Sequence, residues 1–162
     1  MIKKIQVLDS NYGQQLFMLQ KKAYQIEADI IGFADIPPLL ETYDQFINCN
    51  ETFIGFFKAD TLAGAISYTK EIMHIEICRI VVHPDYFRQG IAETLLNHLQ
   101  FTCNWEKLSV STGKMNLPAR KLYEKNGFTH LKDVEAAPHF FISLYEKHHH
   151  SFNVRHDKKH DE

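Results

Sequence analysis

The chain has 162 residues, of which 44% are hydrophobic and 23% are charged, and its formal net charge at pH 7 is -2. This length favours a single globular domain with a substantial core, and the balanced charge argues against a general nucleic-acid binder, whose surface would be basic. The N-terminal segment has no apolar run typical of a signal peptide, and no stretch of the sequence has the length and apolarity of a membrane span.

The cysteines indicate a reducing compartment. Cys49, Cys78 and Cys103 are odd in number and lack the C-x-x-C spacing of a metal or redox site. We therefore expect reduced, mostly buried thiols in a cytoplasmic protein.

The first half of the chain predicts a strand, two helices and then three strands. Apolar residues from Leu16 to Ala23 recur at helical spacing, and the pair Pro37-Pro38 is typical of a helical first turn. The runs that follow are rich in β-branched and aromatic side chains, with a hairpin signal at residues 59–61. The expected elements are a strand at 2–8, helices at 12–25 and 37–49, and strands at 52–58, 62–68 and 72–83.

The second half alternates helices and strands. Leu95 and Leu99 share one helical face, and Gly127 suits the left-handed residue that ends a helix. The expected elements are a helix at 90–105, a strand at 108–111, a helix at 117–126, and strands at 128–134 and 140–147. An antiparallel meander followed by a crossover helix predicts a mixed α/β (α+β) fold.

The composition changes abruptly near the C-terminus. Residues 1–147 are expected to form one domain, whereas residues 148–162 form a polar, His-rich tail. Neutral imidazoles bind Ni, Cu and Zn, so a metal-binding tail is one interpretation. A solvated tail with incidental histidines is the favoured one, and no metal is expected.

The most informative segment is residues 77–96, which runs from a β-branched strand through a turn with Pro84 into a helix. A helix N-terminus presents free backbone N–H groups and a partial positive charge to an anion. Gly90 lies at this N-terminus and has no Cβ, so a phosphate can approach the main chain closely. The segment predicts a phosphate or pyrophosphate site; by itself, Gly90 could also be only a turn residue.

Two motifs identify the class of ligand. The first, Arg/Gln-x-x-Gly-x-Gly/Ala after a strand ending in Val-x-Pro, corresponds here to residues 87–92 after Val82-His83-Pro84. The second, Asn-x-x-Ala-x-x-Leu-Tyr-x-x-x-Gly-Phe, is matched by Asn116, Ala119, Leu122, Tyr123, Gly127 and Phe128. With both motifs in this order, residues 1–147 resemble the GNAT superfamily of acetyl-coenzyme A-dependent N-acetyltransferases. The resemblance implies a mixed central sheet of about seven strands flanked by about four helices.

The resemblance implies acetyl-CoA as the co-substrate and assigns its contacts. Main-chain amides of the first motif would hold the pyrophosphate, and the end of the preceding strand would pair with the pantetheine arm like a neighbouring strand. Asn116 would lie near the arm or the adenosine. The expected cofactor-binding residues are Ile80, Val81, Val82, Arg88, Gln89, Gly90, Ile91, Ala92, Asn116 and Tyr123. Phe87 departs from the motif, which usually has Arg or Gln there, so the backbone and Arg88 take over that contact.

Acetyl transfer to an amine needs a neutral amine, a stabilised oxyanion and a protonated thiolate leaving group. Tyr123 stands where the family places its general acid, and the main-chain N–H near Val81 would stabilise the oxyanion. Glu76 resembles the catalytic Glu of histone acetyltransferases in this superfamily and is the expected base. The alternatives are that Glu76 pairs with Arg79 or faces solvent on the sheet, and that ordered water is the base. Cys78 shares the face of Glu76 and would permit a ping-pong route, although direct attack is the usual family chemistry.

The acceptor is indicated only by charge. The segment from Ala23 to Phe57 has no Lys or Arg but contains Glu27, Asp29, Asp35, Glu41, Asp44 and Glu51. An acidic wall would attract a cationic amine, such as a polyamine or an aminoglycoside-like compound. The alternative is an ordinary solvated face, and a peptide or protein amine also stays open.

The sequence thus predicts an N-acetyltransferase that works by direct attack. The alternative is a non-catalytic coenzyme A-binding sensor or interaction module on the same fold. Similar proteins are often homodimers, but no segment of this sequence identifies an interface.

Overall fold

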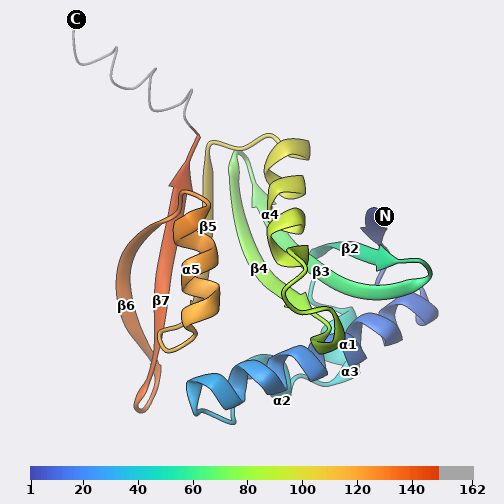
Figure 1. Cartoon of the computed structure of the whole chain (residues 1–162), viewed down its shortest axis with the longest axis horizontal. Coiled ribbons are helices and arrows are strands. Elements are labelled where there is room, and N and C mark those ends of the chain that lie inside the picture. The colour runs from blue at the N-terminus through green and yellow to red at the C-terminus, as the bar shows by residue number, and fades with distance from the viewer. Residues whose placement is uncertain (150–162) are drawn as a thin grey trace, which may run out of the picture.

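Seven strands form one mixed sheet in the computed structural model, which describes residues 1–149 (Figure 1). Their order across the sheet is β1-β2-β3-β4-β5-β7-β6, and every neighbouring pair is antiparallel except the parallel pair of β4 and β5. The strands are β1 (Ile2–Ile5), β2 (Thr52–Lys58), β3 (Thr61–Glu71), β4 (His74–Val82), β5 (Lys107–Gly113), β6 (Thr129–Ala137) and β7 (Phe140–His148). This arrangement confirms the predicted mixed α/β fold.

Helices cover both faces of the sheet. They are α1 (Ser10–Ile31), α2 (Pro37–Leu40), α3 (Tyr43–Ile47), α4 (Ile91–Thr102) and α5 (Leu117–Lys125), with a 3-10 turn, η1 (Pro84–Tyr86), before α4. The consecutive β3 residues Leu62 and Ala63 belong to different clusters of buried side chains. The cluster of Ala63 contains Leu95 of α4 and Tyr123 of α5, whereas that of Leu62 contains Leu16 of α1. Therefore α4 and α5 pack on one face and α1 packs on the other.

Helix α1 extends beyond the helix that the sequence predicted. The Asp9 side chain caps its N-terminus by accepting hydrogen bonds from two backbone N–H groups of the first turn. The helix continues to Gly32, which has φ 71 and donates its N–H to the carbonyl of Ala28. The helix end expected at residue 25 is wrong, because no helix-breaking residue lies between residue 25 and Gly32. The additional turns carry Glu27 to the site described below.

The prediction of a single helix at residues 37–49 is also wrong, because the helical conformation is interrupted at Glu41. This residue is extended, with φ -66 and ψ 130, and Thr42 begins a new helix in a capping box with Gln45. The Glu41 side chain binds Arg79 instead of continuing a helical turn. Five helices are therefore present in residues 1–149, where about four were expected.

Strands β4 and β5 part from each other soon after they meet. Their register covers only His74 to Glu76 on β4 and Lys107 to Ser109 on β5. A bulge in the pairing with β3 leaves Cys78 as an extra residue on β4. In Figure 1 the two strands diverge towards α1. The edge of β4 beyond Glu76 is thus free of a neighbouring strand.

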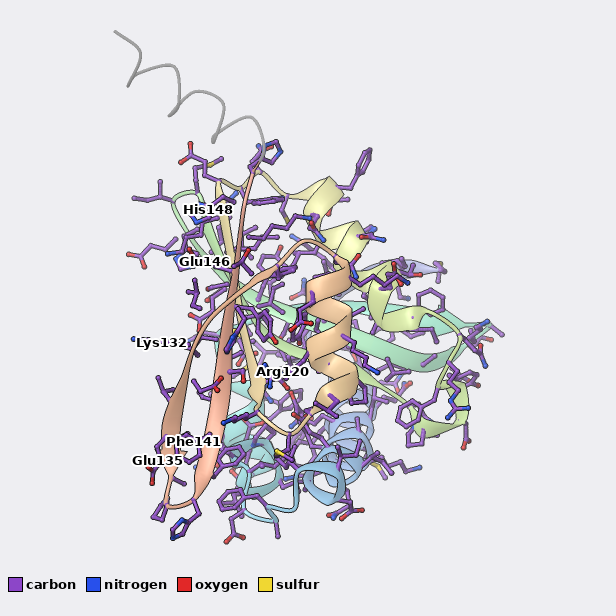
Figure 2. The ribbon with its side chains drawn as sticks, turned by 60° about the vertical axis from the view of Figure 1, so that its left-hand side comes forward. Arg120, Lys132, Glu135, Phe141, Glu146 and His148 are labelled. Atoms are coloured by element: carbon purple, nitrogen blue, oxygen red, sulfur yellow. The ribbon has the colours of Figure 1, made fainter. Side chains whose placement is uncertain are left out.

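Strands β6 and β7 form an outer hairpin beside α5, with Glu135 and Phe141 towards its turn (Figure 2). The hairpin holds α5 through a buried hydroxyl. Arg120 of α5 donates from Nε to the Tyr145 hydroxyl at 2.9 Å, and that hydroxyl donates to Oε1 of Glu124 at 2.9 Å. This network fixes the helix that carries Tyr123.

The expected domain boundary at residue 147 lies one residue before the end of β7. Most of the His-rich tail at 148–162, and with it the metal-binding interpretation, lies outside the described residues. Within residues 1–149, no three His, Cys, Asp or Glu side chains are grouped to hold a metal ion. The helices of the same part of the chain are all too short or too polar to span a membrane.

Candidate active site

A hollow of about 560 Å³ lies between the end of β4, the N-terminus of α4, and helices α1 and α5. Every residue that the sequence assigned to the cofactor lines it, except Gln89. Its volume is in the range of small-molecule sites, roughly 300–1,000 Å³. The structure therefore brings together two motifs that are separated in the sequence.

The N-terminus of α4 forms one end of this first hollow. Gly90 is its N-cap with φ 74, no side chain caps the helix, and Arg88 is also left-handed with φ 62. None of the backbone N–H groups of residues 88–93 donates a hydrogen bond to another residue in the described range 1–149. Unpaired donors at the positive end of a helix suit an anion.

Strand β4 supplies the side wall. On one edge it pairs with β3 as far as Val82, whereas on the other edge the pairing with β5 stops at Glu76. Backbone groups around Ile80 and Val81 are thus open to an extended ligand, which could bind as an added strand. Phe87, which departs from the first motif, lies at the mouth of the hollow and is 43% exposed.

Tyr123 projects from α5 into the same hollow. It is only 5% exposed, and its ring packs against Phe128 and Tyr145 at 5.7 Å between centroids. Its hydroxyl has no hydrogen-bond partner within residues 1–149. Burial, followed by the negative charge of Glu27, raises the pKa of Tyr123, so this hydroxyl keeps its proton at neutral pH.

A second hollow of about 290 Å³ adjoins the first. It lies where β4 and β5 part, under the C-terminal end of α1 and the segment that begins α2. The two hollows share the residues Tyr24, Glu27, Ile80, Asn116, Ala119 and Tyr123. Two compartments that meet at a tyrosine and a carboxylate can bring two reactants together from opposite sides.

Glu27 and Tyr24 are site residues that the sequence interpretation missed. Thr112 donates from Oγ1 to Oε1 of Glu27 at 3.4 Å, and the Asn116 side chain also hydrogen-bonds to this carboxylate. Burial raises the pKa of Glu27, and these two hydrogen bonds oppose the rise. One signal was available: Glu27 follows Gln20 and Tyr24, which lie on the buried stripe of α1, at helical spacing.

The structure does not bring Glu76 to either hollow. Its neighbours Ile75 and Ile77 belong to the buried cluster that contains Tyr123, so strand alternation turns Glu76 to the opposite face, where it is exposed. The alternative expectation, that Glu76 pairs with Arg79, is wrong, because Arg79 binds other carboxylates. Gln89 is likewise exposed and lines neither hollow.

Arg79 is the centre of a largely buried ionic cluster beside the second hollow. It donates to Glu41 at 2.7 Å, to Glu51 at 2.9 Å and to the side-chain amide oxygen Oε1 of Gln20 at 2.7 Å. Burial opposes its charge, but the hydrogen bonds that it donates to both carboxylates dominate and raise the pKa of Arg79. Burial alone would raise the pKa of Glu41, but the hydrogen bond from Arg79 holds the pKa of Glu41 below its usual value.

The acidic residues of the segment from Ala23 to Phe57 do not form the acidic wall that the sequence predicted. Two of the six acids, Glu41 and Glu51, are paired with the single guanidinium of Arg79 and line neither hollow. Asp29, Asp35 and Asp44 are exposed and line neither hollow. Among the six, only Glu27 faces the site.

The class of protein follows from comparison with known families. The sequence model of the acetyltransferase (GNAT) family matches residues 14–128, so the chain belongs to this family. The UPF0157 protein YqkA of Bacillus subtilis (strain 168) is 37% identical over 146 residues, which are 90% of this chain and 43% of YqkA. The uncharacterized N-acetyltransferase YsnE of the same organism is 35% identical over 83 residues, which are 48% of this chain and 55% of YsnE. The chain thus spans about half the length of the curated relatives it matches.

Solved structures share the fold. The PaiA N-acetyltransferase from Thermoplasma acidophilum in complex with coenzyme A has a TM-score of 0.73 and 20% identity, over 92% of this chain and 98% of that one. The ribosomal-protein-S18-alanine N-acetyltransferase from Escherichia coli has a TM-score of 0.70 and 16% identity, over 90% of this chain and 91% of that one. At these identities the likeness concerns the fold, which is the GNAT fold.

Proposed function

We propose that this chain is an acetyl-CoA-dependent N-acetyltransferase that moves the acetyl group to an amine by direct attack. The observation that carries the proposal is the meeting of two hollows at Tyr123. One hollow offers unpaired amides and an open strand edge, and the other gives a second reactant access to the same hydroxyl. Family membership supports acetyl-CoA as the donor.

The residues of the first hollow fit coenzyme A. The amides of residues 88–93 and the N-terminus of α4 would bind the pyrophosphate. The open edge of β4 near Val81 would hydrogen-bond to the pantetheine arm and direct the thioester towards Tyr123. The Tyr123 hydroxyl would then donate a proton to the departing sulfur.

The test of this proposal is thiol release from acetyl-CoA with a panel of amines, together with calorimetric binding of coenzyme A. Binding and turnover are expected. Binding without turnover on any amine would favour a coenzyme A sensor, whereas absence of binding would refute both.

Replacing Gly90 with alanine should weaken coenzyme A binding. A Cβ at Gly90 meets no atom within 4 Å, but it would project at the anion site, and its φ of 74 is unfavourable for alanine. Gly32→Ala is the matched control, since Gly32 has φ 71 and equally open surroundings, lines neither hollow and lies at the C-terminus of α1 instead of the N-terminus of α4. Both variants should lose about 1 kcal/mol of stability from backbone strain, and only Gly90→Ala should raise the Kd for coenzyme A. Equal affinities in the two variants would contradict the anion site.

Cys78→Ser should retain activity. Cys78 lines the second hollow and is exposed, contrary to the expected burial. Partial burial of its thiol, then the charges of Glu51 and Glu76, raises the pKa of Cys78 to about 11. The reactive thiolate is therefore scarce at neutral pH, which supports direct attack. Mass spectrometry after mixing with acetyl-CoA alone should show no acetyl-enzyme; an acetylated Cys78 would establish the ping-pong route instead.

We also propose a cytoplasmic location. The three cysteines are free thiols, the state expected in a reducing compartment. A homodimer stays a proposal from the resemblance alone, to be measured by light scattering.

A further inference from the structure

The second hollow also indicates which amine the enzyme accepts. We propose that the acceptor is a small primary monoamine with an apolar body, whose amino group is bound and deprotonated by Glu27. This inference rests on the proposed transferase function, and it replaces the polycationic acceptor that the acidic sequence segment suggested.

The walls of the second hollow are mainly apolar. Side chains from α1, from the segment that begins α2, and from β4, β5 and β7 contribute, and they include Ile31, Ile36, Pro37, Val110, Phe140 and Ile142. Its volume of about 290 Å³ is at the small end of ligand sites. An apolar group of a few carbon atoms would fill such a space and gain free energy by leaving water.

Glu27 lies at the one end of this hollow that also opens to the cofactor side. It is the only Asp or Glu among the residues that line the second hollow, and Arg79 is the only Lys or Arg. Arg79 is already paired with Glu41 and Glu51, and neither of these carboxylates lines the second hollow, so Glu27 is the carboxylate that a ligand there would meet. A second ammonium group away from Glu27 would be desolvated without a carboxylate to pair with.

Glu27 and Tyr123 carry the proton transfers of the proposed reaction. The bound ammonium gives a proton to the Glu27 carboxylate, and the neutral nitrogen attacks the thioester carbonyl carbon. The C–N bond forms and the C–S bond breaks, with the Tyr123 hydroxyl giving its proton to the sulfur. The remaining excess proton on nitrogen returns to the Tyr123 oxygen, and Glu27 releases its proton to solvent. The products are the acetamide, coenzyme A and one proton.

This role predicts a pH dependence. Glu27 must be ionised to accept a proton, so the rate should fall as the pH drops through the pKa of Glu27, which its surroundings raise. The other ionisable groups that face it or line the second hollow are Tyr24, Tyr123, Arg79 and Cys78. None of these four loses or gains a proton on the acidic side of neutrality: the pKa of each is raised from a value that is already basic.

The first experiment compares hexylamine with cadaverine, which have the same number of heavy atoms. At the far end hexylamine has a methyl group, whereas cadaverine has a second ammonium group. We expect kcat/KM for hexylamine to be higher by about tenfold or more, since an unpaired ammonium in an apolar site is unfavourable by more than the ~1.4 kcal/mol of one decade. A tripeptide with a free N-terminal amine serves as the third substrate and should be acetylated more slowly than hexylamine.

The second experiment uses Glu27→Gln, which keeps the shape of the side chain and an oxygen for the Thr112 hydrogen bond. We expect kcat/KM for hexylamine to fall by about 100-fold and its acidic limb to disappear, because a general base typically contributes 10²–10⁴. The Kd for coenzyme A and the Tm should stay close to wild type. Asp29→Asn is the matched control, an exposed acid on the same helix that lines neither hollow, and its activity should not change.

The outcomes separate the two proposals. Faster turnover of cadaverine or the peptide, or an unchanged acidic limb in Glu27→Gln, would overturn this inference and leave the transferase function intact. No thiol release with any amine, while coenzyme A binds, would refute the transferase function and this inference with it.

Discussion

Replacing Arg79 with methionine is expected to lower the free energy of unfolding by about 3–5 kcal/mol, the typical effect of removing one partner of a buried ion pair. The Arg79 side chain is only 10% exposed, and its partners Glu41 and Glu51 are 17% and 11% exposed. Without the guanidinium, two carboxylates of the same charge would remain in a poorly solvated cluster. The apolar body of methionine fills part of the space, so the loss reports mainly on the charges. Urea denaturation followed by circular dichroism would measure it.

Lys125→Met provides the matched control on the surface. Lys125 binds Glu93 at 3.1 Å, but its side chain is 69% exposed, and such pairs contribute about 0–1 kcal/mol. In the Arg79→Met background, Glu41→Gln together with Glu51→Gln should restore part of the stability by removing the unpaired charges. If Arg79→Met were no more damaging than Lys125→Met, the cluster would be structurally unimportant.

Replacing Tyr123 with phenylalanine is expected to lower kcat by about 100-fold or more, in line with the usual contribution of a general acid. The substitution removes a hydroxyl that has no partner within residues 1–149, so the ring contacts with Phe128 and Tyr145 should persist. Coenzyme A binding should be retained because most of the contacts proposed for it are with the main chain. Steady-state kinetics and calorimetry on the same preparation would separate the two effects.

Tyr68→Phe is the control for the loss of a buried hydroxyl. Tyr68 is 8% exposed, contacts the Cys103 thiol at 3.7 Å and lines neither hollow. Its variant should keep the wild-type kcat. Full activity in Tyr123→Phe would assign the acid to another group, with Tyr24 as the next candidate because it lines both hollows.

The sequence predicted the elements whose signals are local. The hairpin of β2 and β3 and the strand that becomes β4 lie within a few residues of their expected positions. The errors came where a tertiary contact or a cap decides the end of a helix. Glu41 breaks the expected second helix while its side chain binds Arg79, and α1 continues to Gly32 because no breaker comes earlier.

The residues of the first hollow could likewise be predicted, because the contacts proposed for the cofactor involve short contiguous stretches of main chain. Residues 88–92 form a helix N-terminus whatever surrounds them, and Gly90 adopts the left-handed conformation that such a turn needs. Nearly all the residues named from the two motifs line one hollow. Their roles in binding and catalysis stay predictions for the experiments above.

The acceptor side was decided only by the tertiary structure. Glu76 looked like a base by its spacing from Gly90, yet the alternation of β4 turns it away from Tyr123. Glu27 looked like one acid among six, yet α1 places it between the two hollows. The sequence shows how many charges a segment carries but not how they pair, and in the fold the distant Arg79 pairs with Glu41 and Glu51. The sequence by itself thus determined the family and the fold, and it located the turn and helix N-terminus at residues 88–92 that we propose as the anion site, because these features depend on local sequence signals. The carboxylate that lines both hollows depends on which distant side chains meet, and only the folded chain determines that.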